Sequence, residues 1–244
     1  PTLGWPFLAA EALSTGAVTA HRLRRDYVRI YPGVWMPREA TLTAQHRARA
    51  AWLWSRRHGV LSGLSASATL GAKWIDPDTP AEIIHTNRRA PPGLIVHTDA
   101  LLPGEVRTAR GLPVTTAART AFDLGRRLDP TQGVQRVDAL MNATGLKAVE
   151  VMAVADAHPG ARDLRQLDET LPLVDGGSES PYESLARLTL VRAGFPPPQT
   201  QIRVYGNYGE LIACIDMGWE EYLVGVDFEG KHHWLDPKQR DVTP

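Results

Sequence analysis

Residues 211–233 read LIACIDMGWEEYLVGVDFEGKHH, and this stretch decides how the C-terminal part of the chain is interpreted. Its pattern predicts two short strands, 211–217 and 222–229, with a turn between them at Gly218 and Trp219. Side chains alternate between the two faces of a strand. The second strand therefore presents an apolar row on one face, made of Val224, Val226 and Phe228.

Acidic side chains follow the other face of that predicted strand. Asp227 and Glu229 alternate with the apolar residues, and Asp216 ends the neighbouring strand. Carboxylates gathered on adjacent strands repel one another unless a cation or a basic group is close to them. Oxygen ligands of this kind suit Mg²⁺ or Mn²⁺. The pattern therefore favours a divalent-metal site, and an exposed acidic strand face is the alternative.

A helix is predicted before these strands, from Ser180 to Gly194. Ser180 suits the N-cap, Pro181 suits the first helical position, and Glu183 completes a capping box. Strand 201–205 and a hairpin turn at 207–209 come next. The predicted order is thus a helix followed by three strands, and capping alone accounts for Glu183.

The order of these motifs, SPYE at 180–183, ID at 215–216 and VDFEGKHH at 226–233, resembles the PD-(D/E)xK nuclease core. More narrowly, it is similar to the bacterial family related to very-short-patch-repair endonucleases. The resemblance implies a magnesium- or manganese-dependent endonuclease whose metal ligands are Asp216, Asp227 and Glu229. It implies catalytic roles for Asp216, Asp227, Glu229, Lys231, His233 and Glu183.

Two departures from that family stand in the sequence. The order of its two acids is exchanged here, with Asp227 first and Glu229 second. The family continues into an arginine-bearing helix and a further strand, whereas this sequence stops at Pro244. We therefore expect the endonuclease-like domain to be truncated at its C-terminus.

The charge of the chain is distributed unevenly, although the 27 basic and 27 acidic residues cancel. Residues 1–60 carry nine arginines and no lysine against three acids, whereas residues 171–244 carry six basic residues against eleven acids. A basic head and an acidic tail suggest a polyanion as one partner and a cation as another. Uneven surface charge without function is the alternative.

Cysteine content and hydropathy exclude several classes of protein. Cys214 is the single cysteine, which rules out a disulfide framework and a cysteine-rich zinc cluster. No early segment resembles a signal peptide, and no apolar run is long enough to span a bilayer. We therefore expect a cytoplasmic protein that does not enter membranes.

The N-terminal 60 residues follow the order of a winged helix. A short apolar helix at 7–13 precedes a second helix from Thr19 to about Arg25, and a hairpin follows over 27–36. In such a module the second helix enters the major groove and the wing contacts the DNA backbone. The predicted DNA-binding residues are His21, Arg22, Arg24, Arg25 and Arg29. A solvated, functionless face of a small helix is the alternative.

The middle of the chain alternates helices and short strands. Helices are predicted at 43–57, 62–70, 115–127, 132–142 and 147–157, and strands at 82–86 and 93–97. The segments AHRLRR…VRIYPGVW and LPVTTAARTAFDL resemble the N-terminal part of actinobacterial proteins related to AbiEi antitoxins. That resemblance implies a winged-helix domain followed by a mixed α/β domain.

These interpretations give a mixed α+β chain of three domains: a winged-helix-like region (1–60), an antitoxin-like α/β domain (61–172) and an endonuclease-like domain (178–244). The leading hypothesis is a DNA-binding, magnesium-dependent endonuclease. The second is a transcription regulator or type IV antitoxin-like protein with a catalytically silent nuclease fold. The third is an interaction module for a partner protein or a second copy of the chain.

Overall fold

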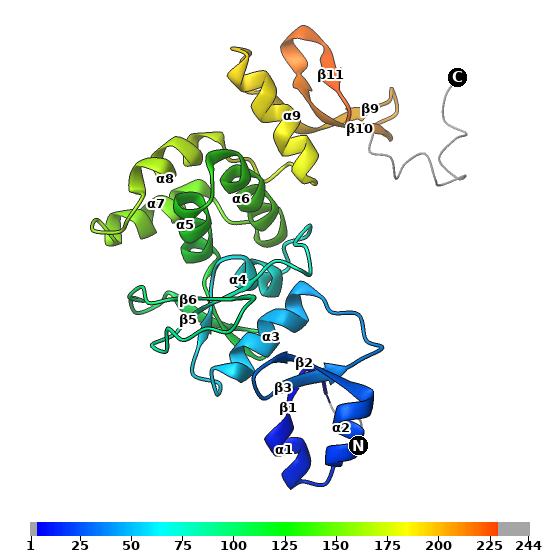
Figure 1. The fold of residues 1–244 in the computed structure, drawn as a ribbon. Helices are drawn as coiled ribbons and strands as arrows, with labels where there is room; N and C mark the ends of the chain where they lie inside the picture. The colour runs from blue at the N-terminus through cyan, green and yellow to red at the C-terminus, as the bar shows by residue number, and fades with distance from the viewer. Residues whose placement is uncertain (1–3, 229–244) are drawn as a thin grey trace. The chain divides into compact units, whose positions relative to one another are not determined.

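A computed structural model describes residues 4–228 of the 244-residue chain. The chain divides into two compact units, an N-terminal unit of residues 1–176 and a C-terminal unit of residues 177–244. The described residues form helices and three separate sheets, so the predicted mixed α+β class is confirmed (Figure 1). Among these residues, no helix is both long enough and apolar enough to cross a membrane.

The head, residues 4–37, is a small sheet with two helices. Its sheet has the order β1-β3-β2 and is antiparallel. Its apolar centre consists of Phe7, Ala12, Val18 and Leu23. The elements are β1 (Phe7–Leu8), α1 (Ala9–Ser14), α2 (Ala20–Asp26), β2 (Tyr27–Tyr31) and β3 (Val34–Pro37).

The sequence predicted the helices and strands of the head in part. Thr19 caps α2, because its hydroxyl accepts a hydrogen bond from the Arg22 backbone N–H at 3.3 Å. The hairpin of β2 and β3 is confirmed, and Gly33 takes a left-handed conformation in its turn. The predicted helix at 7–13 was wrong at its start, because Phe7 and Leu8 pair with β3 as a strand.

A five-stranded sheet with the order β6-β5-β4-β8-β7 forms the middle of the N-terminal unit. Helix α3 packs against both the head sheet and α4 (Figure 1). The Tyr31 hydroxyl on β2 also donates a hydrogen bond to the Gly93 carbonyl at 2.8 Å, which joins the head to this sheet. The elements are α3 (Ala44–Trp54), β4 (Val60–Leu61), α4 (Gly63–Leu70), β5 (Ala81–Ile84), β6 (Leu94–His97), β7 (Val106–Ala109) and β8 (Leu112–Thr115).

Four helices complete the unit around a second apolar core that includes Phe122, Leu140, Val151 and Leu167. A Cβ added at Gly125 on α5 would lie 2.6 Å from the Leu167 side chain, so glycine allows α5 and α8 to pack closely. The elements are α5 (Ala117–Arg127), α6 (Pro130–Thr144), α7 (Ala148–Ala157) and α8 (Leu164–Thr170), with a 3₁₀ turn η1 (Leu171–Leu173).

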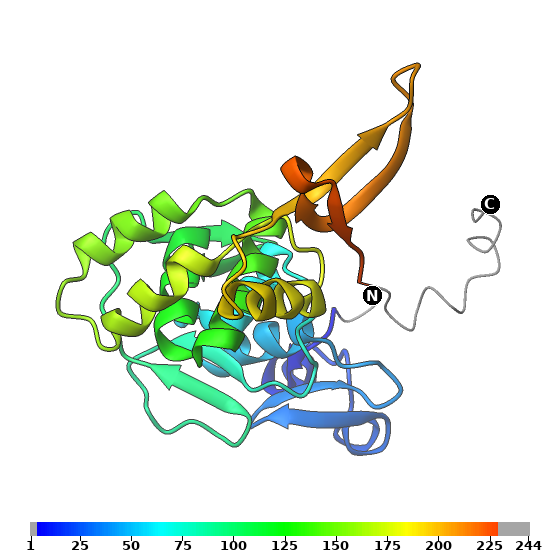
Figure 2. The same cartoon turned by 90° about the horizontal axis from the view of Figure 1, so that it is seen from above.

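The C-terminal unit contains one helix and an antiparallel sheet of order β11-β10-β9. The predicted order of one helix and three strands is confirmed. Figure 2 shows β9 and β10 as a long hairpin, with the short β11 pairing near one end. The elements are α9 (Pro181–Arg192), β9 (Gln199–Tyr205), β10 (Leu211–Trp219), η2 (Glu220–Tyr222) and β11 (Val224–Val226).

The predicted limits of the last two strands were wrong. The turn expected at Gly218 and Trp219 is part of β10, because Gly218 pairs with Gly225 and Trp219 pairs with Val224. The reversal comes later, through η2 and a left-handed Leu223. Strand β11 ends at Val226, so Asp227 follows the strand instead of lying within it.

Candidate functional site

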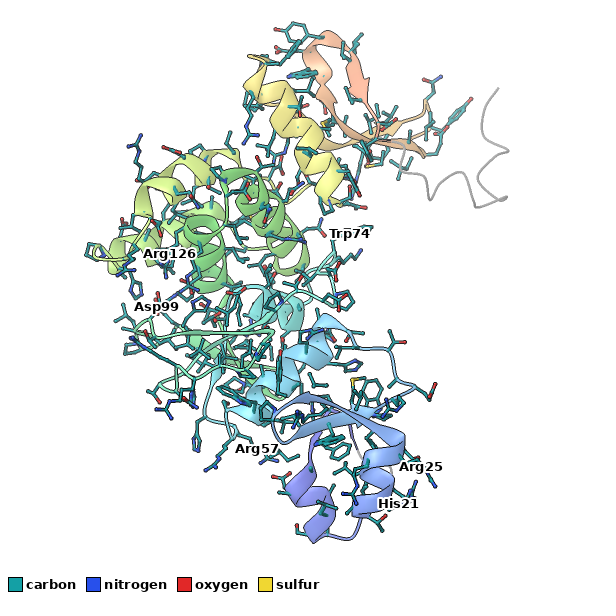
Figure 3. All side chains as sticks on the ribbon, in the orientation of Figure 1. His21, Arg25, Arg57, Trp74, Asp99 and Arg126 are labelled. Carbon is teal, nitrogen blue, oxygen red and sulfur yellow. The ribbon has the colours of Figure 1, made fainter. Side chains whose placement is uncertain are left out.

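The predicted DNA-binding residues form an exposed basic surface on the head. All five, His21, Arg22, Arg24, Arg25 and Arg29, are exposed, whereas Leu23 between them is buried in the head core. At 100° per residue, His21 and Arg25 project from the side of α2 opposite Leu23. Figure 3 shows these two side chains extending outward from the helix. The five residues are therefore accessible to a large partner.

One acid lies inside this basic surface. Asp26 accepts hydrogen bonds from Arg25 Nε at 2.6 Å and Nη2 at 3.1 Å, and Arg22 Nε lies 3.5 Å from the same carboxylate. The hydrogen bond from Arg25 lowers the pKa of Asp26 below its ordinary value, and the Arg25 pKa is raised by the same bond. Asp26 thus stays ionised and offsets part of the charge of α2.

Arg24 and Arg29 differ from Arg25 in this respect. Among residues 4–228, neither guanidinium has a hydrogen-bond or ion-pair partner. Arg57, which follows α3, is also paired, because it binds Glu11 of the head through two hydrogen bonds of 2.6 and 2.8 Å. Arg24 and Arg29 therefore offer their whole charge to an incoming polyanion, whereas Arg22 and Arg25 share theirs with Asp26.

In the C-terminal unit, the structure brings Asp216 and Asp227 together. Met217 pairs with Val226, so the next residues outward, Asp216 and Asp227, face each other across the ladder. The Asp227 carboxylate accepts the Asp216 backbone N–H at 3.0 Å, and the Asp216 carboxylate accepts the Phe228 N–H at 2.8 Å. Asp216 lies inside β10 and does not end a strand as predicted, and one oxygen of each carboxylate holds the residues after β11 against the middle of β10.

Glu183 acts at the start of α9. Its backbone N–H is bound by the Ser180 hydroxyl at 3.2 Å, as the capping box predicted. Its carboxylate, however, accepts the N–H of Glu179 at 2.8 Å, one residue before the expected Ser180. The Glu183 carboxylate therefore has a structural partner at the helix start.

The remaining predicted catalytic residues, Glu229, Lys231 and His233, lie outside the described residues. Within 4–228, no group of three or more His, Cys, Asp or Glu side chains gathers as a metal site would need. The pair Asp216 and Asp227 is the part of the predicted metal site that can be located.

Sequence reasoning missed a buried ionic network centred on α5. The Arg119 side chain is 1% exposed and donates from Nε to Asp123 at 3.1 Å and from Nη1 to Glu105 at 2.6 Å. Arg126 binds Asp123 and Asp99, and Arg127 Nη2 lies 2.9 Å from Asp99. The spacing Arg119, Asp123, Arg127 is the i, i+4 signal that predicts such pairs on one helix face.

The pKa values of two acids in this network, Asp99 and Glu105, are lowered by their partners. Burial alone would raise the pKa of Asp99, but the charges of Arg127 and Arg126 outweigh it and leave the pKa below its ordinary value. Burial likewise opposes ionisation of Glu105, and hydrogen bonds from the Leu102 N–H, His158 and Arg119 lower its pKa overall. Charges buried in this way are stable only while their partners remain.

Comparison with known proteins matches the larger part of the N-terminal unit. The family model described as the AbiEi antitoxin C-terminal domain matches residues 48–173. The chain is 26% identical over 226 residues to the uncharacterized protein Rv2248 of Mycobacterium tuberculosis strain H37Rv, and equally to the uncharacterized protein MT2308 of strain CDC 1551 / Oshkosh. Each alignment covers 88% of this chain and 79% of the relative. No solved structure matches the chain.

Proposed function

The chain belongs to the family of the AbiEi antitoxin C-terminal domain, and from that premise we propose that it is a DNA-binding transcription regulator of the antitoxin type. In this proposal the head binds DNA as a winged helix. Helix α2 enters the major groove, and the β2–β3 hairpin contacts the sugar-phosphate backbone. The single observation that carries the proposal is the exposed basic surface of His21, Arg22, Arg24, Arg25 and Arg29 beside the family match.

Three features of the head support this reading. The basic side chains of α2 lie on the side of the helix that faces away from the apolar centre of the head, where they are open to contact with a DNA groove. Thr19 caps the N-terminus of α2 and stabilises its first turn, so the basic side chains of α2 have defined positions on the helix. Helix α3 and the Tyr31 hydroxyl bind the head to the antitoxin-family domain, which makes the head part of the same rigid scaffold.

The proposal is tested by binding of labelled duplex DNA from the region upstream of the chain's own gene, measured by fluorescence anisotropy. If four arginines contact phosphates, the logarithm of the association constant falls with the logarithm of salt concentration with a slope of about −4. The variants Arg22→Ala and Arg25→Ala each reduce that slope by roughly one.

Arg165→Ala serves as the matched control, because Arg165 is an exposed arginine of the same unit whose side chain, within residues 4–228, pairs with Glu169 alone. This variant is expected to leave both affinity and slope unchanged. An absence of binding at low salt, or equal losses in Arg165→Ala and Arg22→Ala, contradicts the proposal.

A second candidate is the magnesium-dependent endonuclease, and the pairing of Asp216 with Asp227 favours it. Two neighbouring carboxylates, one within β10 and one just after β11, fit Mg²⁺, which normally keeps several water ligands. In this candidate Asp216, Asp227 and Glu229 hold the ion, which neutralises phosphate charge and activates a water when bound. The Asp216 and Asp227 carboxylates also bind backbone N–H groups, which holds residues 227–228 beside β10.

A plasmid-nicking assay with Mg²⁺ or Mn²⁺ separates the two candidates. The endonuclease candidate requires nicking that Asp216→Asn and Asp227→Asn abolish. The regulator proposal expects no nicking, and it expects DNA affinity within about twofold of wild type in both variants, because neither residue belongs to the head. Metal-dependent nicking lost in both variants would establish the endonuclease.

A further inference from the structure

Helix α7 presents an uncovered apolar stripe on the N-terminal unit. Its inner side packs against α5, and Val151 is fully buried in the second apolar core (Figure 1). On the other side of the helix, Val149 is 67% exposed and Met152 is 54% exposed. Among the described residues of this unit, these are the two most exposed large apolar side chains, and they lie one helical turn apart. Apolar side chains scattered singly over a surface are ordinary, whereas neighbours on one helix face form a patch.

The stripe continues along α7 with a small residue and an acid. At 100° per residue, four exposed residues lie within about 100° of one another on the side opposite Val151: Val149, Met152, Ala153 and Asp156. The small side chain of Ala153 leaves room for a second helix to approach the stripe. The exposed side of α7 is therefore shaped like the contact face of a helix pair.

Opposite charges stand at the two ends of this stripe. Lys147 is the N-cap residue of α7, and Asp156 lies in its last turn. Neither side chain has an ion-pair partner within residues 4–228. A helix favours acids at its N-terminus and bases at its C-terminus, so each of these charges lies at the less favourable end. Glu150 lies outside the stripe and accepts the Lys147 backbone N–H at 2.8 Å.

From these observations we propose that α7 binds α7 of a second copy of this chain, as an antiparallel pair about a two-fold axis. In such an interface the same patch is used on both subunits. The antiparallel alignment brings Lys147 of each copy beside Asp156 of the other and places Met152 near the axis. The apolar side chains of the two stripes then cover one another between two ion pairs.

A second copy fits this surface because the stripe carries both halves of its own complement, a base at one end and an acid at the other. Each charge at a helix end gains an opposite charge from the partner, and the dipoles of the two helices run in opposite directions. The inference needs only the N-terminal unit and does not depend on the proposed DNA binding.

The oligomeric state of the full chain, measured by sedimentation equilibrium without DNA, tests the proposal. The ten residues of α7 span about 15 Å, so one helix pair lies at the low end of interface sizes. Protein concentrations from roughly 1 μM to 1 mM cover the Kd values of such contacts. We expect a reversible monomer–dimer equilibrium within that range.

Two single variants locate the interface. Met152→Lys is expected to raise the dimer Kd roughly tenfold or more, because it places like charges close together near the axis. Ile95→Lys is the matched control, since Ile95 is a 44% exposed apolar residue on β6 of the same unit. This control is expected to leave Kd unchanged. Both side chains are exposed, and circular dichroism and thermal unfolding check that both variants keep the fold.

Charge reversal tests the antiparallel alignment. Lys147→Glu and Asp156→Lys are each expected to raise Kd about fivefold, because each sets like charges opposite one another at both ends of the pair. The double variant Lys147→Glu/Asp156→Lys exchanges the two charges and is expected to restore Kd to within about threefold of wild type. Apolar association without this alignment gives no such recovery.

Three results overturn the proposal. The first is a monomer at every concentration, and the second is an equal rise in Kd for Met152→Lys and Ile95→Lys. The third is a double charge exchange that dimerises no better than the single reversals. A wild-type monomer whose thermal stability changes in Met152→Lys would assign the stripe to a contact within one chain.

Discussion

Replacing Arg119 by methionine is expected to destabilise the N-terminal unit by about 3–5 kcal/mol. The methionine fills a similar volume, so the loss comes mainly from charge and hydrogen bonding. Asp123 is fully buried and Glu105 is nearly so, and Arg119 binds both. Without its guanidinium, two buried carboxylates lose a partner, and the carbonyl of Ala100 loses a hydrogen bond of 2.9 Å.

The neighbouring arginines limit that loss without preventing it. Arg126 still donates two hydrogen bonds to Asp123, and His158 Nε2 still lies 2.6 Å from Glu105. Since Glu105 then keeps its charge in a buried site, a second change to glutamine should recover part of the stability. We expect the double variant Arg119→Met/Glu105→Gln to be more stable than Arg119→Met alone. The difference measures the energetic coupling between Arg119 and Glu105, which single variants do not reveal.

Amide hydrogen exchange along α5 measures this effect within one unit, since it reports local free energies of opening. The control is Arg165→Ala, whose ion pair with Glu169 is exposed and is worth less than about 1 kcal/mol. A loss below about 1 kcal/mol in Arg119→Met would mean that the network contributes little to stability.

The sequence revealed those features that depend on neighbouring residues. Ser180 caps a helix as predicted, and Thr19 and Thr116 cap helices near their predicted starts, because a cap involves a side chain and a backbone group three residues apart. The helix and three strands of the C-terminal unit follow from alternation and turn residues for the same reason. These signals need no knowledge of the rest of the fold.

The parts that the sequence concealed depend on distant pairing. Strands β4, β7 and β8 were not predicted, since the two residues of β4 form a strand only by joining β5 and β8. The hairpin of β7 and β8 turns at Arg110 and Gly111, which both have positive φ. Arginine rarely takes this conformation, so the sequence does not mark Arg110 as a turn residue. Burial of a single strand residue depends on the fold in the same way: the Cys214 side chain is exposed, and its Sγ lies 3.3 Å from Gln201 Oε1.

The candidate sites divide in the same way. The basic residues of α2 were visible because they lie within five positions of one another. The ionic network was partly visible as Arg119, Asp123 and Arg127, but Asp99 and Glu105 join it from the β6–β8 region, and no spacing predicts that. Asp216 and Asp227 lie next to each other, although Asp227 lies beyond the end of its strand, and their role as metal ligands stays a prediction.

Reversing the charges of Arg24 and Arg29 together is expected to weaken DNA binding by roughly 100-fold or more. These two arginines have no ion-pair partner within the described residues, so their whole charge is available to phosphates. Glutamate at both positions removes two contacts and adds repulsion at each. Both side chains are exposed, so the fold of the head is expected to remain, as its circular dichroism and thermal unfolding would show.

Asp26 provides the opposite change at the same surface. Asp26→Asn removes the acid that binds Arg25 and lies near Arg22, so both arginines act on phosphates with their whole charge and the repulsion between Asp26 and DNA is lost. We expect affinity to rise severalfold and the salt slope to become steeper, whereas Arg24→Glu/Arg29→Glu makes it shallower. Anisotropy titrations at several salt concentrations measure both quantities. If Asp26→Asn weakened binding, or the double reversal left the slope unchanged, DNA would have to bind elsewhere than on the exposed face of α2.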